Sequence, residues 1–341
     1  MLSISHFETG IKITGQSQDI EGDGTLEATD PENVDLINEP ENKEVIQSKQ
    51  IALKIDTIFK ASINVIGQAF QDHVQIPTAL EAINKLLKQG VLITREVEIK
   101  GYDREEIKLN FNFKRNGFGY CTLEADAVAG LNELAQRPEN RAMRVAFRKL
   151  MISELEKWGK TQGFSFKAVI PVDTVYRKTD QTARAIFNSV FLSHVDFSAY
   201  DSEILKHFKD TWKPNMEEIL GSQMSDEDYH QMKVVQMVNI WMPLNRETPE
   251  NILALLDISS MQGQELRPYT AVRRGGRRFF TALALADKPW HQWIFQFDMK
   301  RGDAVIFDSF KTPHTAVQIE RLSAVPARES VEIRALFIDY P

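Results

Sequence analysis

Hydrophobic positions at helical spacing follow a long polar start. Within residues 51–70, apolar side chains recur every three or four positions, which predicts an amphipathic helix. A second helix is predicted over residues 80–89, because its leucines and isoleucine repeat similarly and Gly90 suits the position just beyond a helix end. Similar patterns over 124–136 and 140–158 predict two more helices. We therefore expect an N-terminal helical scaffold.

Short apolar runs predict strands, a few among the helices and many in the second half of the chain. Residues 91–99 and 107–113 fit strands, the latter by strict alternation. Gly275-Gly276 suits a tight hairpin. Beyond residue 164, turn residues separate six further apolar runs, at 167–172, 234–241, 252–258, 293–297, 304–307 and 331–338. This order predicts an α+β protein with a double-stranded β-helix (jelly roll) core and an N-terminal helical scaffold.

Composition divides the chain into three parts. Residues 1–46 include the acidic stretch 19–44, which is too polar to offset the entropy lost on ordering and is expected to be a flexible tail or linker. Residues 47–163 form the predicted helical and short-strand region, and residues 164–341 the jelly-roll catalytic core. A role of the acidic stretch beyond spacing is left open, as is a homodimer formed through the N-terminal helices.

Charge and cysteine content exclude several classes of function. The net charge of −7 argues against a nucleic-acid partner, which needs a concentrated basic face. Cys121 is the only cysteine, so an internal disulfide and a cysteine-rich zinc site are excluded. The start has no secretory pattern, and no run of eighteen apolar residues occurs, so we expect a cytoplasmic protein that makes no membrane contact.

Three residues form a candidate metal site. His194 and Asp196 are two positions apart in a predicted strand, so that both side chains project from the same face and can converge on one ion. His314 is the candidate for the second histidine of a two-histidine, one-carboxylate site, which leaves three coordination positions open. A His-x-Asp motif alone is weak evidence, because it occurs by chance in many proteins.

A nearby motif supplies candidates for binding a dicarboxylate. Arg328 offers a planar guanidinium fork, and Ser330 lies on the same strand face with a hydroxyl group. Arg334 shares that face and competes with Arg328 for the role. Asn239 and Trp241 alternate on another predicted strand and are further candidates for lining the pocket, although a core tryptophan beside a strand-end asparagine is an equally good interpretation.

These motifs resemble the CmcJ/NvfI-type oxidoreductases, which include the cephamycin 7α-methoxylation component and fungal gibberellin-desaturase-like enzymes. The resemblance covers roughly residues 170–341, and Ala327 stands where the family often has proline. Besides His194-Val-Asp196, it rests on Thr174-Val-Tyr-Arg177, Val238-Asn-Ile-Trp241-Met-Pro243, Tyr269-Thr-Ala-Val272, Phe307-Asp308-Ser309, Pro313-His314-Thr-Ala and Ala327-Arg328-Glu-Ser-Val-Glu-Ile-Arg334. It implies a jelly roll, Fe(II) and 2-oxoglutarate, and an oxidation of a secondary metabolite.

The sequence therefore predicts an Fe(II)- and 2-oxoglutarate-dependent oxygenase that uses O2 to act on a small molecule. His194, Asp196 and His314 are the predicted ligands. The predicted cofactor-binding residues are Arg328, Ser330, Arg334, Asn239 and Trp241, with Arg328 preferred over Arg334 because it pairs with Ser330. Two alternatives stay open: a non-redox, metal-dependent cupin-like enzyme, and a non-catalytic partner subunit that keeps the fold.

Overall fold

The computed structural model describes residues 57–66, 74–77, 85–178, 192–197, 216–217, 225–245, 252–263, 265–272, 278–286, 288–317 and 328–341. All of them belong to one compact unit, Ala52–Pro341. The acidic stretch 19–44, the rest of segment 1–46 and the Gly275-Gly276 turn lie outside the described residues.

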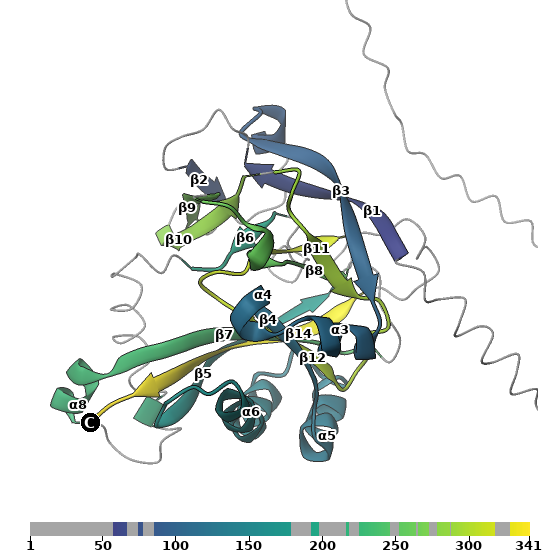
Figure 1. Ribbon diagram of the computed structural model, residues 1–341. Helices are drawn as coiled ribbons and strands as arrows, with labels where there is room; N and C mark the ends of the chain where they lie inside the picture. Colours follow the sequence, from purple (N-terminus) through teal and green to yellow (C-terminus); the bar gives the residue numbers. More distant parts are fainter. Residues whose placement is uncertain are drawn as a thin grey trace, which may run out of the picture. The chain divides into compact units, whose positions relative to one another are not determined.

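Two β-sheets form the described unit (Figure 1). The nine-stranded sheet has the order β1 (Thr57–Ile66), β3 (Leu92–Tyr102), β11 (Trp293–Gln296), β8 (Ile252–Leu256), β13 (His314–Val317), β6 (His194–Val195), β10 (Arg278–Leu285), β9 (Leu266–Val272) and β2 (Val74–Pro77). The five-stranded sheet has the order β4 (Phe118–Thr122), β12 (Asp303–Asp308), β7 (Lys233–Pro243), β14 (Glu329–Asp339) and β5 (Ala168–Lys178). Most neighbours are antiparallel, but β11 with β3 and β2 with β9 are parallel, so the larger sheet is mixed.

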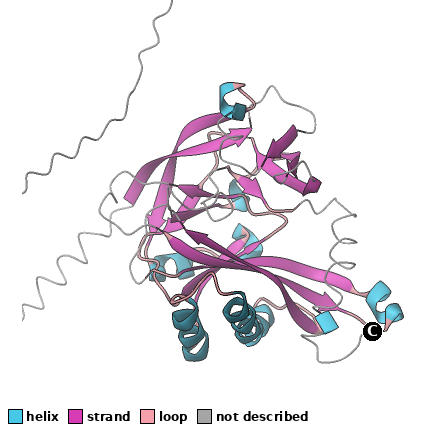
Figure 2. Ribbon diagram, turned by 180° about the vertical axis from the view of Figure 1, so that it is seen from behind, coloured by secondary structure: helices cyan, strands magenta, loops and turns pink. Residues whose placement is uncertain are grey.

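Alternation along β7 and β14 gives the five-stranded sheet two different faces. On β14, the apolar side chains of Val331, Ile333 and Phe337 join a core with helices α5 (Ala125–Leu134) and α6 (Arg141–Thr161). The residues between them, such as Glu332 and Arg334, project from the opposite face, because successive side chains of a strand point to opposite sides. Both views show α5 and α6 along the same side of this sheet (Figure 1, Figure 2).

A separate apolar cluster joins the two sheets. Trp241 of β7 and Phe307 of β12 pack with Leu255 of β8 and Ile294 of β11, all of them almost fully buried. Burying side chains of this size stabilises a fold by about 1.5–3 kcal/mol each. This cluster fixes the spacing between the sheets and lies beside the predicted metal ligand His314, whose ring centroid is 4.7 Å from that of Phe307.

The helix predicted over residues 51–70 is wrong. Residues Thr57–Ile66 form strand β1, which pairs with β3 from Thr57↔Gly101 to Ile66↔Leu92. Ala61, Ile63 and Val65 are buried at alternate positions. Apolar residues four apart also share a strand face, so the spacing was ambiguous, and cross-strand pairing of β-branched residues decided it. The expected N-terminal helical scaffold is therefore not confirmed for this stretch, and a homodimer through the N-terminal helices stays a prediction.

The strand predicted over residues 107–113 is also wrong. Helix α3 (Arg104–Asn110) begins with a capping box in which the Asp103 carboxylate accepts from the Glu106 backbone N–H, and the Glu106 carboxylate accepts from that of Asp103. Helix α4 (Phe113–Asn116) follows and ends at Gly117, where φ is 83°. Alternation misled here, since Leu109 lies 85% exposed while Ile107 is buried. The local capping signal outweighed a short two-residue periodicity.

The remaining predicted elements that fall on described residues are confirmed in type. Residues 85–88 are helical, and Gly90 has the positive φ, 71°, that follows many helix ends. Helices α5 and α6 match the patterns at 124–136 and 140–158, and strands β3, β5, β7, β8, β11, β12 and β14 match the apolar runs. A short helix, α8 (Asp226–Gln231), precedes β7. None of the helices in the described part of the chain combines the length and apolarity that a membrane crossing requires.

Candidate metal centre

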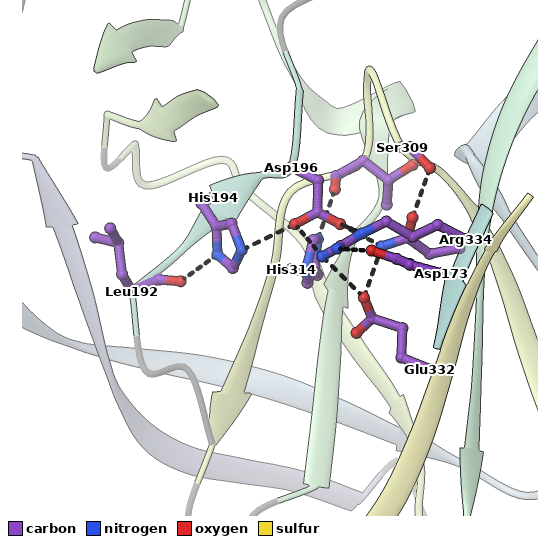
Figure 3. Close-up of polar contacts among 10 residues, drawn as sticks. Asp173, Leu192, His194, Asp196, Ser309, His314, Glu332 and Arg334 are labelled. Carbon is purple, nitrogen blue, oxygen red and sulfur yellow. Dashed lines mark hydrogen bonds and ion pairs between the residues drawn. The ribbon is translucent and has the colours of Figure 1, made fainter. Parts of the chain in front are cut away.

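The three predicted metal ligands come together between the sheets. His194 and His314 are directly paired across strands β6 and β13, and Asp196 follows β6 two residues after His194. One potential ligand atom from each residue lies within 4.8 Å of the other two, and all three side chains are buried. The His194 Nε2 and Asp196 Oδ1 atoms are 3.4 Å apart. Figure 3 shows the Asp196 carboxylate beside both imidazole rings.

Both histidines are oriented by the same local contact. His194 Nδ1 lies 2.8 Å from the carbonyl oxygen of Leu192, and His314 Nδ1 lies 3.2 Å from that of Thr312. An Nδ1–H that donates to a carbonyl leaves Nε2 as the bare, metal-binding nitrogen. Burial, and then the neighbouring His194, lowers the pKa of His314 to about 3, so this ring is neutral at physiological pH. Neutral imidazole is the form that binds a metal ion.

Two side chains hold the Asp196 carboxylate from behind. The Asn239 amide donates to Oδ2, and the Arg334 guanidinium donates from Nε to Oδ2 at 3.3 Å and from Nη2 to Oδ1 at 3.2 Å. Ser309 Oγ in turn donates to the Asn239 carbonyl at 2.6 Å, which fixes the direction of the amide. Burial alone would raise the pKa of Asp196, but Arg334 and His194 hold it well below its ordinary value. Asp196 is therefore an ionised, oriented carboxylate.

Arg334 connects three carboxylates. Besides Asp196, its guanidinium contacts Asp173 at 3.1 Å and Glu332 at 3.2 Å (Figure 3). Burial disfavours the charge on Arg334, yet these carboxylates together raise its pKa above its ordinary value. Burial also raises the pKa of Glu332. The structure thus places Arg334 at the back of Asp196, and Asn239 beside it.

A small cavity opens on the two histidines. Its lining consists of Arg177, His194, Trp241, Leu253, His314, Thr315, Ala316, Arg328 and Glu332. Arg328 is buried and lies over the Trp241 ring, with its guanidinium carbon 5.4 Å from the ring centroid. Burial, and then the like charge of Arg177, lowers the pKa of Arg328 to about 9. Of the two arginines that compete for the dicarboxylate in the sequence, only Arg328 lines this cavity.

Ser330 lies two residues after Arg328, the spacing that puts both side chains on the same strand face. It is 1% exposed, and its Oγ has no hydrogen-bond partner among the described residues; the same holds for Trp241 Nε1. Buried polar atoms are nearly always paired in folded proteins. Trp241 lines the cavity, so its unpaired N–H is available there as a donor to a polar ligand, and Ser330 offers a second donor next to the lining residue Arg328.

Several residues of the site carried no assigned role in the sequence. Arg177 belongs to the Thr174-Val-Tyr-Arg177 motif, and Glu332 has the same strand parity as Arg328. Both residues could therefore have been placed in the site from the sequence. Asp173, in contrast, had none. Asp308, which could have oriented a ligand, instead ends β12 and accepts from the Phe310 backbone N–H at 2.8 Å.

The donor set suits iron(II). Two neutral imidazoles and one carboxylate, with open positions facing a cavity, form the arrangement found in non-haem iron oxygenases. The outer contacts that fix the ring tautomers and the carboxylate are also those expected around a metal. The fit to iron(II) rests on the donor atoms and their orientation.

Comparisons with known proteins identify a family for the chain and a fold that it shares. An oxidoreductase/YMDC permease-like domain model matches residues 78–338. Among solved structures, the iron and alpha-ketoglutarate-dependent endoperoxidase NvfI is similar, with a TM-score of 0.62 at 15% identity over 84% of this chain and 99% of that one. NvfI in a different conformation gives a TM-score of 0.61 at 14% identity, with the same coverage of both chains. No curated protein sequence matches the chain.

These structural matches show a shared fold, which is the mixed, sheet-rich architecture described above. The family match covers well over half of the chain and reaches from before β3 almost to the end of β14. The matched range includes His194, Asp196 and His314. It also includes Arg334 of β14 and Arg328, which directly precedes that strand. The chain belongs to the oxidoreductase/YMDC permease-like domain family.

Proposed function

We propose that the protein is an Fe(II)- and 2-oxoglutarate-dependent oxygenase that oxidises a small molecule of the secondary-metabolite class. The observation that carries the proposal is the buried His194, Asp196 and His314 cluster facing a cavity that also contains Arg328. Similarity of fold to NvfI, which is named as an iron and alpha-ketoglutarate-dependent enzyme, supports it.

Each residue has a distinct proposed role. His194, Asp196 and His314 hold the metal, and Arg328 with Ser330 binds the distal carboxylate of 2-oxoglutarate through a charged fork and a hydroxyl. Iron(II) with 2-oxoglutarate and O2 supplies the oxidising chemistry when bound. Arg334 and Asn239 orient Asp196 rather than bind the co-substrate. Trp241 packs against Arg328 and limits the directions in which its guanidinium can point.

The finer description of the fold belongs to the same proposal. We assign the two facing sheets to a double-stranded β-helix, because the candidate ligands lie on adjacent strands inside it, as an oxygenase jelly roll requires. Residues 164–341 supply every proposed ligand, and residues 47–163 add β1 to β4 and helices α3 to α6. A cytoplasmic location remains a prediction.

An anaerobic titration tests the proposed function. Metal-free protein is titrated with Fe(II) and then with 2-oxoglutarate, while the visible charge-transfer band of the chelate is followed. We expect a band in the wild type, none in His314→Ala, and a co-substrate requirement raised about 10- to 100-fold in Arg328→Ala, since a hydrogen bond to a charged group contributes about 1.5–3 kcal/mol. Tight metal binding without a band at any 2-oxoglutarate concentration would refute the oxygenase.

The same titration separates the two alternatives. A non-redox cupin-like enzyme would bind metal but would not need Arg328, so its activity would survive Arg328→Ala. A non-catalytic partner subunit would bind no metal after anaerobic loading. The buried and oriented ligand cluster favours a metalloenzyme over the partner subunit.

A further inference from the structure

Arg177 lies at the same end of the cavity as Arg328. It is on strand β5, where the antiparallel register with β14 places it directly opposite Ser330. Residues directly opposite each other in an antiparallel pair project from the same sheet face, with Cβ atoms about 4.5–5.5 Å apart. Both arginines line the cavity. The sheet therefore gathers Arg177, Arg328 and Ser330 into one cluster.

This cluster lies at a distance from Asp196. Arg334, which contacts Asp196, is four residues beyond Ser330 along β14. Four residues of strand span about 13 Å. The cavity connects the two ends, because its lining includes His194 and His314 as well as both arginines. A ligand attached to the metal at one end can therefore extend toward the arginines at the other.

The residues that line the cavity include two arginines and one carboxylate. Glu332 is the only carboxylate among the residues lining this cavity, and its Oε1 is 3.2 Å from Arg334 and 3.3 Å from the Asn239 amide. That carboxylate is therefore shared with an arginine outside the lining. Burial and then the like charge of Arg177 lower the pKa of Arg328, as expected when two guanidinium groups lie close enough to act on one anion.

We propose that Arg177 is a second anchor for the distal carboxylate of the co-substrate, acting together with Arg328 to select a 2-oxo dicarboxylate over a 2-oxo monocarboxylate. This inference rests on the proposed function. A carboxylate has two oxygens and can accept several charged hydrogen bonds, so one guanidinium fork does not exhaust it. Ser330 Oγ, which has no partner among the described residues, supplies another donor to the same group.

The test compares two co-substrates that differ at the distal end. The full chain, loaded anaerobically with Fe(II), is titrated with 2-oxoglutarate and with pyruvate, which lacks the distal carboxylate. Calorimetry on the Ni(II)-loaded protein gives the same affinities without redox chemistry. Arg177→Gln is compared with Arg177→Lys and with Arg95→Gln, a matched change at an exposed position of β3.

We expect Arg177→Gln to weaken 2-oxoglutarate binding about 10- to 100-fold and to leave pyruvate binding unchanged. Arg177→Lys keeps the charge but loses the guanidinium fork, so it is expected to weaken 2-oxoglutarate binding less. If Arg177→Gln does not fold, Arg177→Lys replaces it in the test. Adding Arg328→Gln to Arg177→Gln is expected to cost less than the two single losses combined, because both side chains act on one carboxylate.

Two results for Arg177→Gln would overturn the inference. One is an unchanged affinity for 2-oxoglutarate. The other is an equal loss of affinity for 2-oxoglutarate and pyruvate, which would place the effect at the metal or in the fold. If the wild type itself binds neither acid, the proposed function fails instead, and the two failures are thereby distinguished.

Discussion

Removing the cation behind Asp196 is expected to make the fold depend on a bound metal ion. In Arg334→Met, the Asp196 carboxylate loses donors at 3.3 and 3.2 Å, while Asp173 and Glu332 lose contacts at 3.1 and 3.2 Å. Asp196 and Glu332 are 3% and 4% exposed, so solvent cannot replace those contacts. Breaking a buried ion pair by removing one partner costs about 3–5 kcal/mol.

That cost can be read as a shift in melting temperature. For a unit of this size, each kcal/mol corresponds to roughly 2–4 °C, so metal-free Arg334→Met should melt about 6–20 °C below the wild type. A divalent cation at His194, Asp196 and His314 replaces the missing positive charge. Saturating Zn(II), a redox-inert probe, should therefore raise the melting temperature of the variant more than that of the wild type.

The control is Lys60→Met, which removes an ion pair with Glu96 whose side chains are 70% and 66% exposed. Such surface pairs contribute about 0–1 kcal/mol, so its stability and its response to metal should match the wild type. Differential scanning calorimetry with and without Zn(II) measures all three proteins. If Zn(II) raises the melting temperature of Arg334→Met by no more than that of the wild type, the charge compensation is refuted.

Three further changes test the packing, the local structure and the metal centre. Gly159→Ala should lower the free energy of unfolding by about 1–3 kcal/mol in urea titrations, because the added Cβ would collide with the ring of Phe337 and lie 3.0 Å from that of Phe166; unchanged stability would mean that α6 can move away from the sheet. Asp103→Ala removes the capping box of α3 and should cost about 1 kcal/mol in the same assay, with an unchanged midpoint arguing against the cap. Chelator treatment should lower the melting temperature of Zn(II)-loaded wild type but not of His314→Ala; a similar drop in both would place the metal elsewhere.

The candidate site was more predictable than the N-terminal part of the fold. His194 and Asp196 could be paired because two-residue spacing on a strand fixes the relative direction of their side chains. His314 had to be chosen from separate, ordered motifs, since sequence distance says nothing about spatial distance. The structure brings all three together across the β6–β13 pair. Competition between Arg328 and Arg334 could not be resolved from parity, because both lie on one strand face.

The wrong predictions have a common physical origin. The spacing of Phe59 and Ile63 fits both a helix and a strand, and only pairing with β3 decides between them. Residues 107–113 alternate, yet Asp103 and Glu106 cap a helix there. In each case the hydrophobic periodicity predicted one type of secondary structure, and a second, independent constraint, strand pairing or helix capping, decided the type that forms. Long helices such as α6 were predictable because their pattern persists over several turns.

Strand β14 lies between two environments that place opposite demands on it. Its apolar positions, such as Val331 and Ile333, pack toward the helices, while Ser330, Glu332 and Arg334 face the metal centre and its cavity. A shift by one residue would carry charged groups into the apolar core and apolar groups to the site. Evolution can therefore substitute residues in this strand, but a single insertion or deletion would destroy the core and the chemistry together. The spacing of this segment should be far more constant among relatives than its composition.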